Sequence, residues 1–117
     1  MPFLSDLDVK ILRGGDRVLL RPLAYATLPY TDHNLITVPS GFVTDFASVP
    51  DWALSLVNGD DLEAPATLHD YLYRNHIGTR SQADKILWDS MGDVGVSMWK
   101  KVLVYAAVRI AGWASWR

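Results

Sequence analysis

The sequence contains no cysteine, and this absence excludes three kinds of chemistry at once. A chain without cysteine forms no disulfides, offers no thiolate to a metal ion and has no cysteine nucleophile. The N-terminal residues also lack the basic start, the long apolar segment and the small-residue cleavage site of a secretory signal. We therefore expect synthesis in the cytoplasm.

An excess of positive charge and long hydrophobic runs are missing as well. The 11 basic and 13 acidic residues give a formal net charge of −2, whereas a surface that binds nucleic acid carries a concentrated basic surplus. We expect no nucleic-acid partner. In the most apolar segment the uninterrupted apolar run covers only residues 102–108, far fewer than the roughly 18 to 20 residues that span a bilayer. No transmembrane helix is expected.

The chain does have apolar bulk. Half of its 117 residues are hydrophobic, and they include five tryptophans and five tyrosines. A chain of this length fits one domain and can bury a core without a disulfide or a structural zinc ion. We predict that residues 1–117 form a single domain.

The N-terminal half has the character of short strands, because β-branched and aromatic residues are separated by closely spaced turn residues. Helical patterns follow a short helical turn that Pro50 opens. The sequence thus predicts an α+β fold, with a small antiparallel β-sheet in the N-terminal half followed by three helices, two of them an antiparallel pair. The predicted strands cover 8–13, 17–28, 35–39 and 40–45, and the predicted helices cover 62–74 with Pro65 in its first turn, 81–92 with Ser81 as the cap, and 97–112.

The last predicted helix is the most apolar part of the chain, and three roles for it remain open. Four basic residues flank its apolar run beside three tryptophans: Lys100, Lys101, Arg109 and Arg117, with Trp99, Trp113 and Trp116. This pattern suits a core helix, a face that docks on a protein partner, or a helix that lies on a membrane surface.

Two polar residues occupy helix positions where the pattern calls for apolar ones. His69 shares a helix face with Leu72 and Tyr73, and Asp84 interrupts an apolar stripe that continues at Leu87. A carboxylate without a partner is costly to bury, so Asp84 must meet a donor, a cation or a metal ion, or lie at the rim of a cleft. Because a short link joins the two helices, we predict that His69 and Asp84 face each other.

Such a pair has two interpretations. It can be a satisfied polar pair in the core, or it can be a site. In a site, Asp84 would hold Nδ1–H of His69, and Nε2 would take a proton from water. Asp70, at the rim of the same helix face, would suit a hard cation such as Ca²⁺. Zinc is a further alternative for these ligands.

Asp45 is a third carboxylate in an apolar segment, "GFVTDFASVP". It could lock the turn before Pro50 by accepting hydrogen bonds from the backbone or from Ser48. Alternatively, it could belong to the site, since clusters of acids and histidine on apolar segments often mark one.

The segments "TVPSGFVTDFASVP", "ATLHDYLYR" and "SQADKILWDSM" resemble a small uncharacterised family found in bacteriophages and prophages, over residues 36–112. This resemblance implies a phage origin, with genes near tail and lysis modules. Other virion or tail proteins are then the expected partners, and the expected locations are the host cytoplasm and the virion.

The shorter stretch "HDYLYRN", followed by "ADKILWDSM", resembles the two antiparallel helices of secretory calcium-dependent phospholipases. The resemblance implies that His69 is the catalytic base, that Asp84 orients it, that Asp70 is a Ca²⁺ ligand and that Tyr73 is a supporting hydrogen-bond donor. The expected function is a phage virion or lysis-associated protein that hydrolyses esters in the lipid of the host envelope. The alternatives are a non-catalytic tail or virion structural protein and a metal-dependent cell-wall hydrolase.

Overall fold

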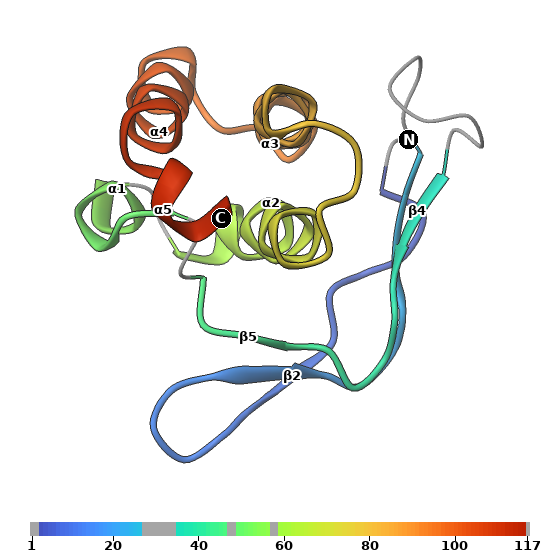
Figure 1. Ribbon diagram of the computed structural model, residues 1–117. Coiled ribbons are helices and arrows are strands. Elements are labelled where there is room, and N and C mark those ends of the chain that lie inside the picture. Colours follow the sequence, from blue (N-terminus) through green and yellow to red (C-terminus); the bar gives the residue numbers. More distant parts are fainter. Residues whose placement is uncertain (1–2, 27–34, 47–48, 57–58, 117) are drawn as a thin grey trace.

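The computed structural model describes residues 3–26, 35–46, 49–56 and 59–116. Within them, the N-terminal half forms two small antiparallel sheets and the C-terminal half is helical (Figure 1). The predicted α+β class is confirmed, with two sheets in place of the predicted one. The three-stranded sheet has the order β1 (Val9–Ile11), β2 (Arg17–Leu19), β5 (Val43–Thr44), and the two-stranded sheet pairs β3 (Leu23–Ala26) with β4 (Leu35–Val38).

The predicted strand over residues 17–28 is divided between the two sheets. β2 ends at Leu19 and β3 begins at Leu23. Pro22 lies in the interruption and has no N–H to donate to a neighbouring strand. The chain therefore leaves the first sheet here and enters the second.

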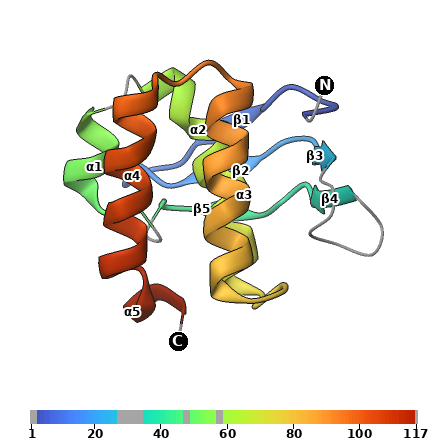
Figure 2. The same ribbon diagram turned by 90° about the horizontal axis from the view of Figure 1, so that it is seen from above.

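The helices pack beside one another on one side of the sheets. α2, α3 and α4 run side by side in alternating directions, so the predicted antiparallel pair is present (Figure 2). Among the residues that the structure describes, no helix combines the length and the apolar character needed to cross a membrane. The helices are α1 (Asp51–Leu56), α2 (Gly59–Arg74), α3 (Arg80–Asp93), α4 (Met98–Ala111) and α5 (Trp113–Trp116).

Two helix starts differ from the prediction. α2 begins three residues earlier than expected, which places Pro65 inside the helix and not in its first turn. α3 is capped by Thr79 and not by Ser81. The Thr79 hydroxyl accepts a hydrogen bond from the backbone N–H of Gln82 at 3.1 Å, and the Gln82 side chain accepts one from the N–H of Thr79 at 2.8 Å. This reciprocal pair satisfies two donors that Ser81 would leave open.

α2 lies between the two parts of the hydrophobic core. On one side, Leu62 and Ala66 pack with apolar side chains of α1, α3 and α4. On the other side, Leu68 and Leu72 pack with side chains of β2, β3, β4 and α3. His69, which lies on the same helix, is consequently held between packed elements.

Candidate functional site

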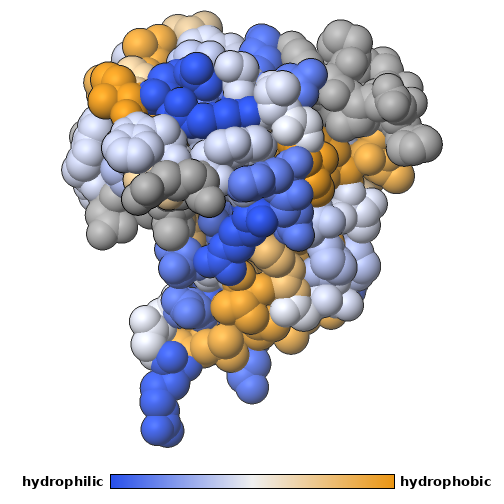
Figure 3. All heavy atoms as spheres, viewed as in Figure 1, coloured by the Kyte–Doolittle hydropathy of each residue, from blue (hydrophilic) through white to orange (hydrophobic). Residues whose placement is uncertain are grey.

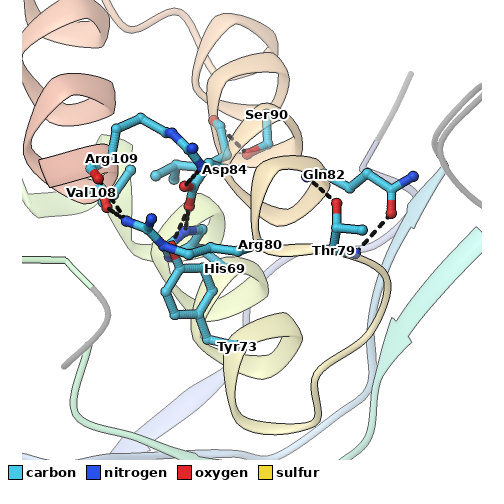
Figure 4. A network of polar contacts seen from close by, with 10 residues as sticks. His69, Tyr73, Thr79, Arg80, Gln82, Asp84, Ser90, Val108 and Arg109 are labelled. Carbon is cyan, nitrogen blue, oxygen red and sulfur yellow. Dashed lines mark hydrogen bonds and ion pairs between the residues drawn. The ribbon is translucent and has the colours of Figure 1, made fainter. Parts of the chain in front are cut away.

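His69 and Asp84 meet across the seam between α2 and α3. Nε2 of His69 lies 2.7 Å from Oδ1 of Asp84, and neither side chain has any exposed surface (0%). Figure 4 shows the two side chains pointing toward each other. The facing arrangement is therefore the one that the helical pattern predicts, and the catalytic roles stay a prediction.

The nitrogen that faces Asp84 differs from the prediction. From the sequence we expected the Nδ1–H of His69 to donate to Asp84, whereas in the structure Nε2 lies against the carboxylate. Nε2 is the ring nitrogen farther from the backbone of α2, so it is the one that reaches a side chain on a neighbouring helix. Nδ1 is then the nitrogen that any proton transfer to a substrate or water would use.

Asp84 of α3 receives hydrogen bonds from three side chains on two neighbouring helices, α2 and α4. The hydroxyl of Tyr73 donates to Oδ1 at 2.5 Å, next to Nε2 of His69, and Arg109 of α4 donates to Oδ2 at 2.8 Å. Burial alone would raise the pKa of Asp84, but the hydrogen bonds from His69, Tyr73 and Arg109 lower it below its ordinary value. Asp84 is therefore a carboxylate at neutral pH.

His69 is correspondingly neutral. Complete burial lowers the pKa of His69, although the hydrogen bond to Asp84 acts in the opposite direction. A neutral imidazole has one N–H, and the carboxylate of Asp84 can only accept a hydrogen bond. The proton therefore resides on Nε2, and Nδ1 carries the basic lone pair.

Arg80 connects the hydrogen-bond network of His69, Tyr73, Asp84 and Arg109 to backbone carbonyls near the end of α4. Its Nε donates to the Tyr73 hydroxyl at 3.2 Å, and its Nη2 donates to the backbone carbonyls of Val108 and Arg109 at 2.6 and 2.8 Å. The hydroxyl of Tyr73 is thus fixed between Arg80 and Asp84, and burial followed by the hydrogen bond to Asp84 raises the pKa of Tyr73 well above its ordinary value.

Arg80 and Arg109 are the members of the network that the sequence interpretation missed. The only available signal was the requirement that a buried Asp84 meet a donor or a cation. The chain contains 11 basic residues, and helical periodicity alone does not say which of them approaches Asp84 from a third helix.

Asp70 does not lie at a rim, as the sequence interpretation placed it. Its exposed fraction is 2%, because this side of α2 packs against β5. Oδ2 of Asp70 accepts a hydrogen bond from the hydroxyl of Thr44 at 2.8 Å and lies 3.4 Å from Nε of Arg74. Burial raises the pKa of Asp70, while Thr44 and Arg74 oppose that rise.

Asp45 is joined to Asp70 through a shared arginine. Nη2 of Arg74 donates to Oδ1 of Asp45 at 3.1 Å, and Nη1 donates to the carbonyl of Val43 at 2.8 Å. The site therefore has two parts, with His69, Tyr73 and Asp84 in one part and Asp45 and Asp70 in the other. The predicted alternative in which Asp45 bonds Ser48 lies outside the described residues.

A family model matches residues 18–108, which run from β2 through most of α4 and include every predicted site residue. The chain belongs to the DUF1353 family. That family is described as a protein of unknown function. The expectation of an uncharacterised family is thus confirmed, whereas the phage origin and the phospholipase resemblance stay predictions. No curated protein and no solved structure matches the chain.

Calcium is the cofactor that the resemblance implies for this DUF1353 protein, and Asp70 is the ligand it assigns. Within the described ranges, no group of three or more histidine, aspartate or glutamate side chains is arranged to hold a metal ion. Asp70 and Asp45 instead face the guanidinium of Arg74. In this arrangement the residues do not fit a calcium ion at Asp70, because a positive group already lies between the carboxylates.

Proposed function

We propose that this DUF1353 protein is a phage-encoded ester hydrolase that acts on phospholipid of the host envelope, as a virion or lysis-associated component. One observation carries the enzymatic part. A neutral His69 donates its Nε2–H to the Asp84 carboxylate, and this fixes the tautomer in which Nδ1 is a base.

The proposed reaction uses His69 as a general base and then as a general acid. Nδ1 takes a proton from a water molecule as the water oxygen attacks the ester carbonyl carbon, and the resulting imidazolium is stabilised by the carboxylate of Asp84. The imidazolium then gives that proton to the departing alkoxide. Tyr73 and Arg109 are positioning residues, since they hold the two oxygens of Asp84. No step passes through calcium.

The surface that we assign to the lipid is the outer face of α4. Its buried face contributes Val104 and Val108 to the core, whereas apolar side chains on the opposite face reach the surface, among them Ile110 with an exposed fraction of 77%. Apolar atoms are visible over this part of the molecule in Figure 3. The other large exposed hydrophobic side chains of α4 are Met98, Trp99, Val102 and Leu103, and the exposed Trp113 follows in α5.

The charge around this face favours anionic lipid as the occupant. Residues 94–117 contain no aspartate or glutamate and four basic residues. Lys100 is half-buried with its ammonium group 5.5 Å from the centre of the Trp99 ring, so an amphipathic aromatic and a cation lie together. Basic residues beside tryptophan are typical of helices that bind at the boundary between headgroups and acyl chains.

The burial of the pair favours a second candidate, a non-catalytic tail or virion structural protein. His69 and Asp84 have no exposed surface, and both oxygens of Asp84 accept hydrogen bonds. A pair closed off in this way can stabilise the fold without performing chemistry. The metal-dependent cell-wall hydrolase of the sequence interpretation has no metal-binding group among the described residues to support it.

Hydrolysis of phospholipid vesicles separates the two candidates. Fatty acid release is measured for the wild type, for His69→Gln, and for His76→Gln as a matched control at an exposed histidine outside the network. The hydrolase proposal expects loss of activity in His69→Gln alone, with circular dichroism showing that the variant is folded. Equal activity of wild type and a folded His69→Gln variant, or none in the wild type, would support the structural candidate.

A further inference from the structure

The guanidinium of Arg74 lies among three oxygen atoms, which come from β5, from the residue directly after β5 and from α2. One is the backbone carbonyl of Val43, 2.8 Å from Nη1. The second is Oδ1 of Asp45, 3.1 Å from Nη2, and the third is Oδ2 of Asp70, 3.4 Å from Nε. Each of the three guanidinium nitrogens thus faces a different oxygen. We call these three oxygens the Arg74 oxygen cluster.

The oxygens of this cluster are of the kinds that bind a hard cation. Calcium ions in proteins are held by carboxylates and backbone carbonyls, which is the composition found here. The two carboxylates carry two negative charges close together, and Asp70 is almost completely buried. Such an arrangement requires a positive group, because a buried carboxylate without a partner costs several kcal/mol.

Arg74 supplies that charge from within the chain. It lies one helical turn after Asp70 on α2, and the pairing of β5 with β2 brings Val43 and Asp45 to the same place. The planar guanidinium has donors in fixed directions and keeps its charge at any physiological pH. A divalent cation at the same oxygens would lie within a few ångströms of this charge and be repelled by it.

We infer that Arg74 is the built-in cation of this cluster, that it excludes divalent metal ions from Asp70 in the native protein, and that its removal creates a calcium site. The side chain of Arg74 is 43% exposed, so its loss opens the cluster to solvent. The remaining oxygens then present two carboxylates and a carbonyl to any cation that enters. Calcium binding reports on Arg74 whether or not His69 catalyses a reaction.

The test is a calcium titration of the full chain by calorimetry, together with thermal unfolding in CaCl₂ and in EGTA. The wild type should bind no calcium at Asp70, and its melting temperature should be equal in both buffers. Arg74→Gln should melt lower than the wild type in EGTA and regain part of the loss in CaCl₂. It should bind one calcium ion with a dissociation constant on the order of 10⁻⁴ to 10⁻³ M, the range of weak extracellular calcium-binding modules.

Three further variants make the result specific. Arg74→Lys keeps a positive charge and should not bind calcium, and it serves as the second test should Arg74→Gln fail to fold. Asp70→Asn combined with Arg74→Gln should lose the calcium response. Arg21→Gln removes an arginine from an exposed pair with Asp8 and should behave as the wild type. Calcium binding by the wild type that Asp70→Asn abolishes would overturn the inference, as would a folded Arg74→Gln variant that binds none.

Discussion

Replacing Asp84 by asparagine tests the central pair directly. The substitution keeps the size of the side chain but removes its charge and converts one acceptor oxygen into an NH₂ donor. His69 and Tyr73 both donate to Oδ1, and Arg109 donates to Oδ2. Whichever way the amide turns, its NH₂ group faces at least one donor, so a buried hydrogen bond is lost and replaced by a repulsive contact.

The size of the effect follows from the number and kind of these contacts. A hydrogen bond to a charged group contributes about 1.5 to 3 kcal/mol, and removing one partner of a buried ion pair costs about 3 to 5 kcal/mol. Asp84 has three such donors and no exposed surface. We expect Asp84→Asn to lower the free energy of unfolding by about 3 to 5 kcal/mol, a large share of the roughly 5 to 15 kcal/mol that a domain has.

Urea unfolding followed by tryptophan fluorescence and circular dichroism measures this loss. Asp89→Asn is the matched control, because Asp89 lies on the same helix and its charged partner among the described residues is the partly exposed Lys85, at 3.1 Å. That pair is expected to contribute about 0 to 1 kcal/mol. A loss in Asp84→Asn no larger than in the control would refute the view that the buried carboxylate is held by His69, Tyr73 and Arg109.

Three further predictions concern pH, helix capping and lipid binding. Because burial lowers the pKa of His69, this histidine takes up a proton less readily in the folded state than in the unfolded chain, where histidine has a pKa of about 6.5. In thermal melts of the wild type, the contribution of His69 to stability should be complete above that pH and fall as the pH drops below it. This part of the pH dependence of stability should be absent in His69→Gln. Thr79→Ala removes the reciprocal cap of α3 and should cost about 1 kcal/mol in urea unfolding, whereas Ser81→Ala should have little effect; the reverse order would show that the cap is misplaced. Trp99→Ser combined with Ile110→Ser should reduce co-sedimentation with vesicles of phosphatidylglycerol and phosphatidylcholine, and wild-type protein that stays in the supernatant with these vesicles would exclude the lipid role of α4.

The ends of the helices and strands show where residues close in the chain were enough to predict a boundary. α4 follows Ser97 and ends before Gly112 as predicted, although the Ser97 side chain makes no capping hydrogen bond and Gly112 has a helical φ of −70°. The start of α3 was predicted wrongly, although the sequence contains the signal: Thr79 and Gln82 have the spacing of a capping box, and Ser81 does not form one. The division of the long N-terminal strand was also indicated locally, by Pro22.

The sequence by itself determined that His69 and Asp84 face each other, because helical periodicity places each on the inner face of its helix and the short link between the helices makes them neighbours. Only the tertiary structure decided that Nε2 is the nitrogen at Asp84, that Arg109 reaches Asp84 from α4, and that Asp70 is buried beside Arg74. The physical reason is the distance along the chain over which each signal acts. Periodicity and capping depend on residues within a few positions of one another, whereas the partners of a buried charge are chosen by the packing of elements that are distant in the chain.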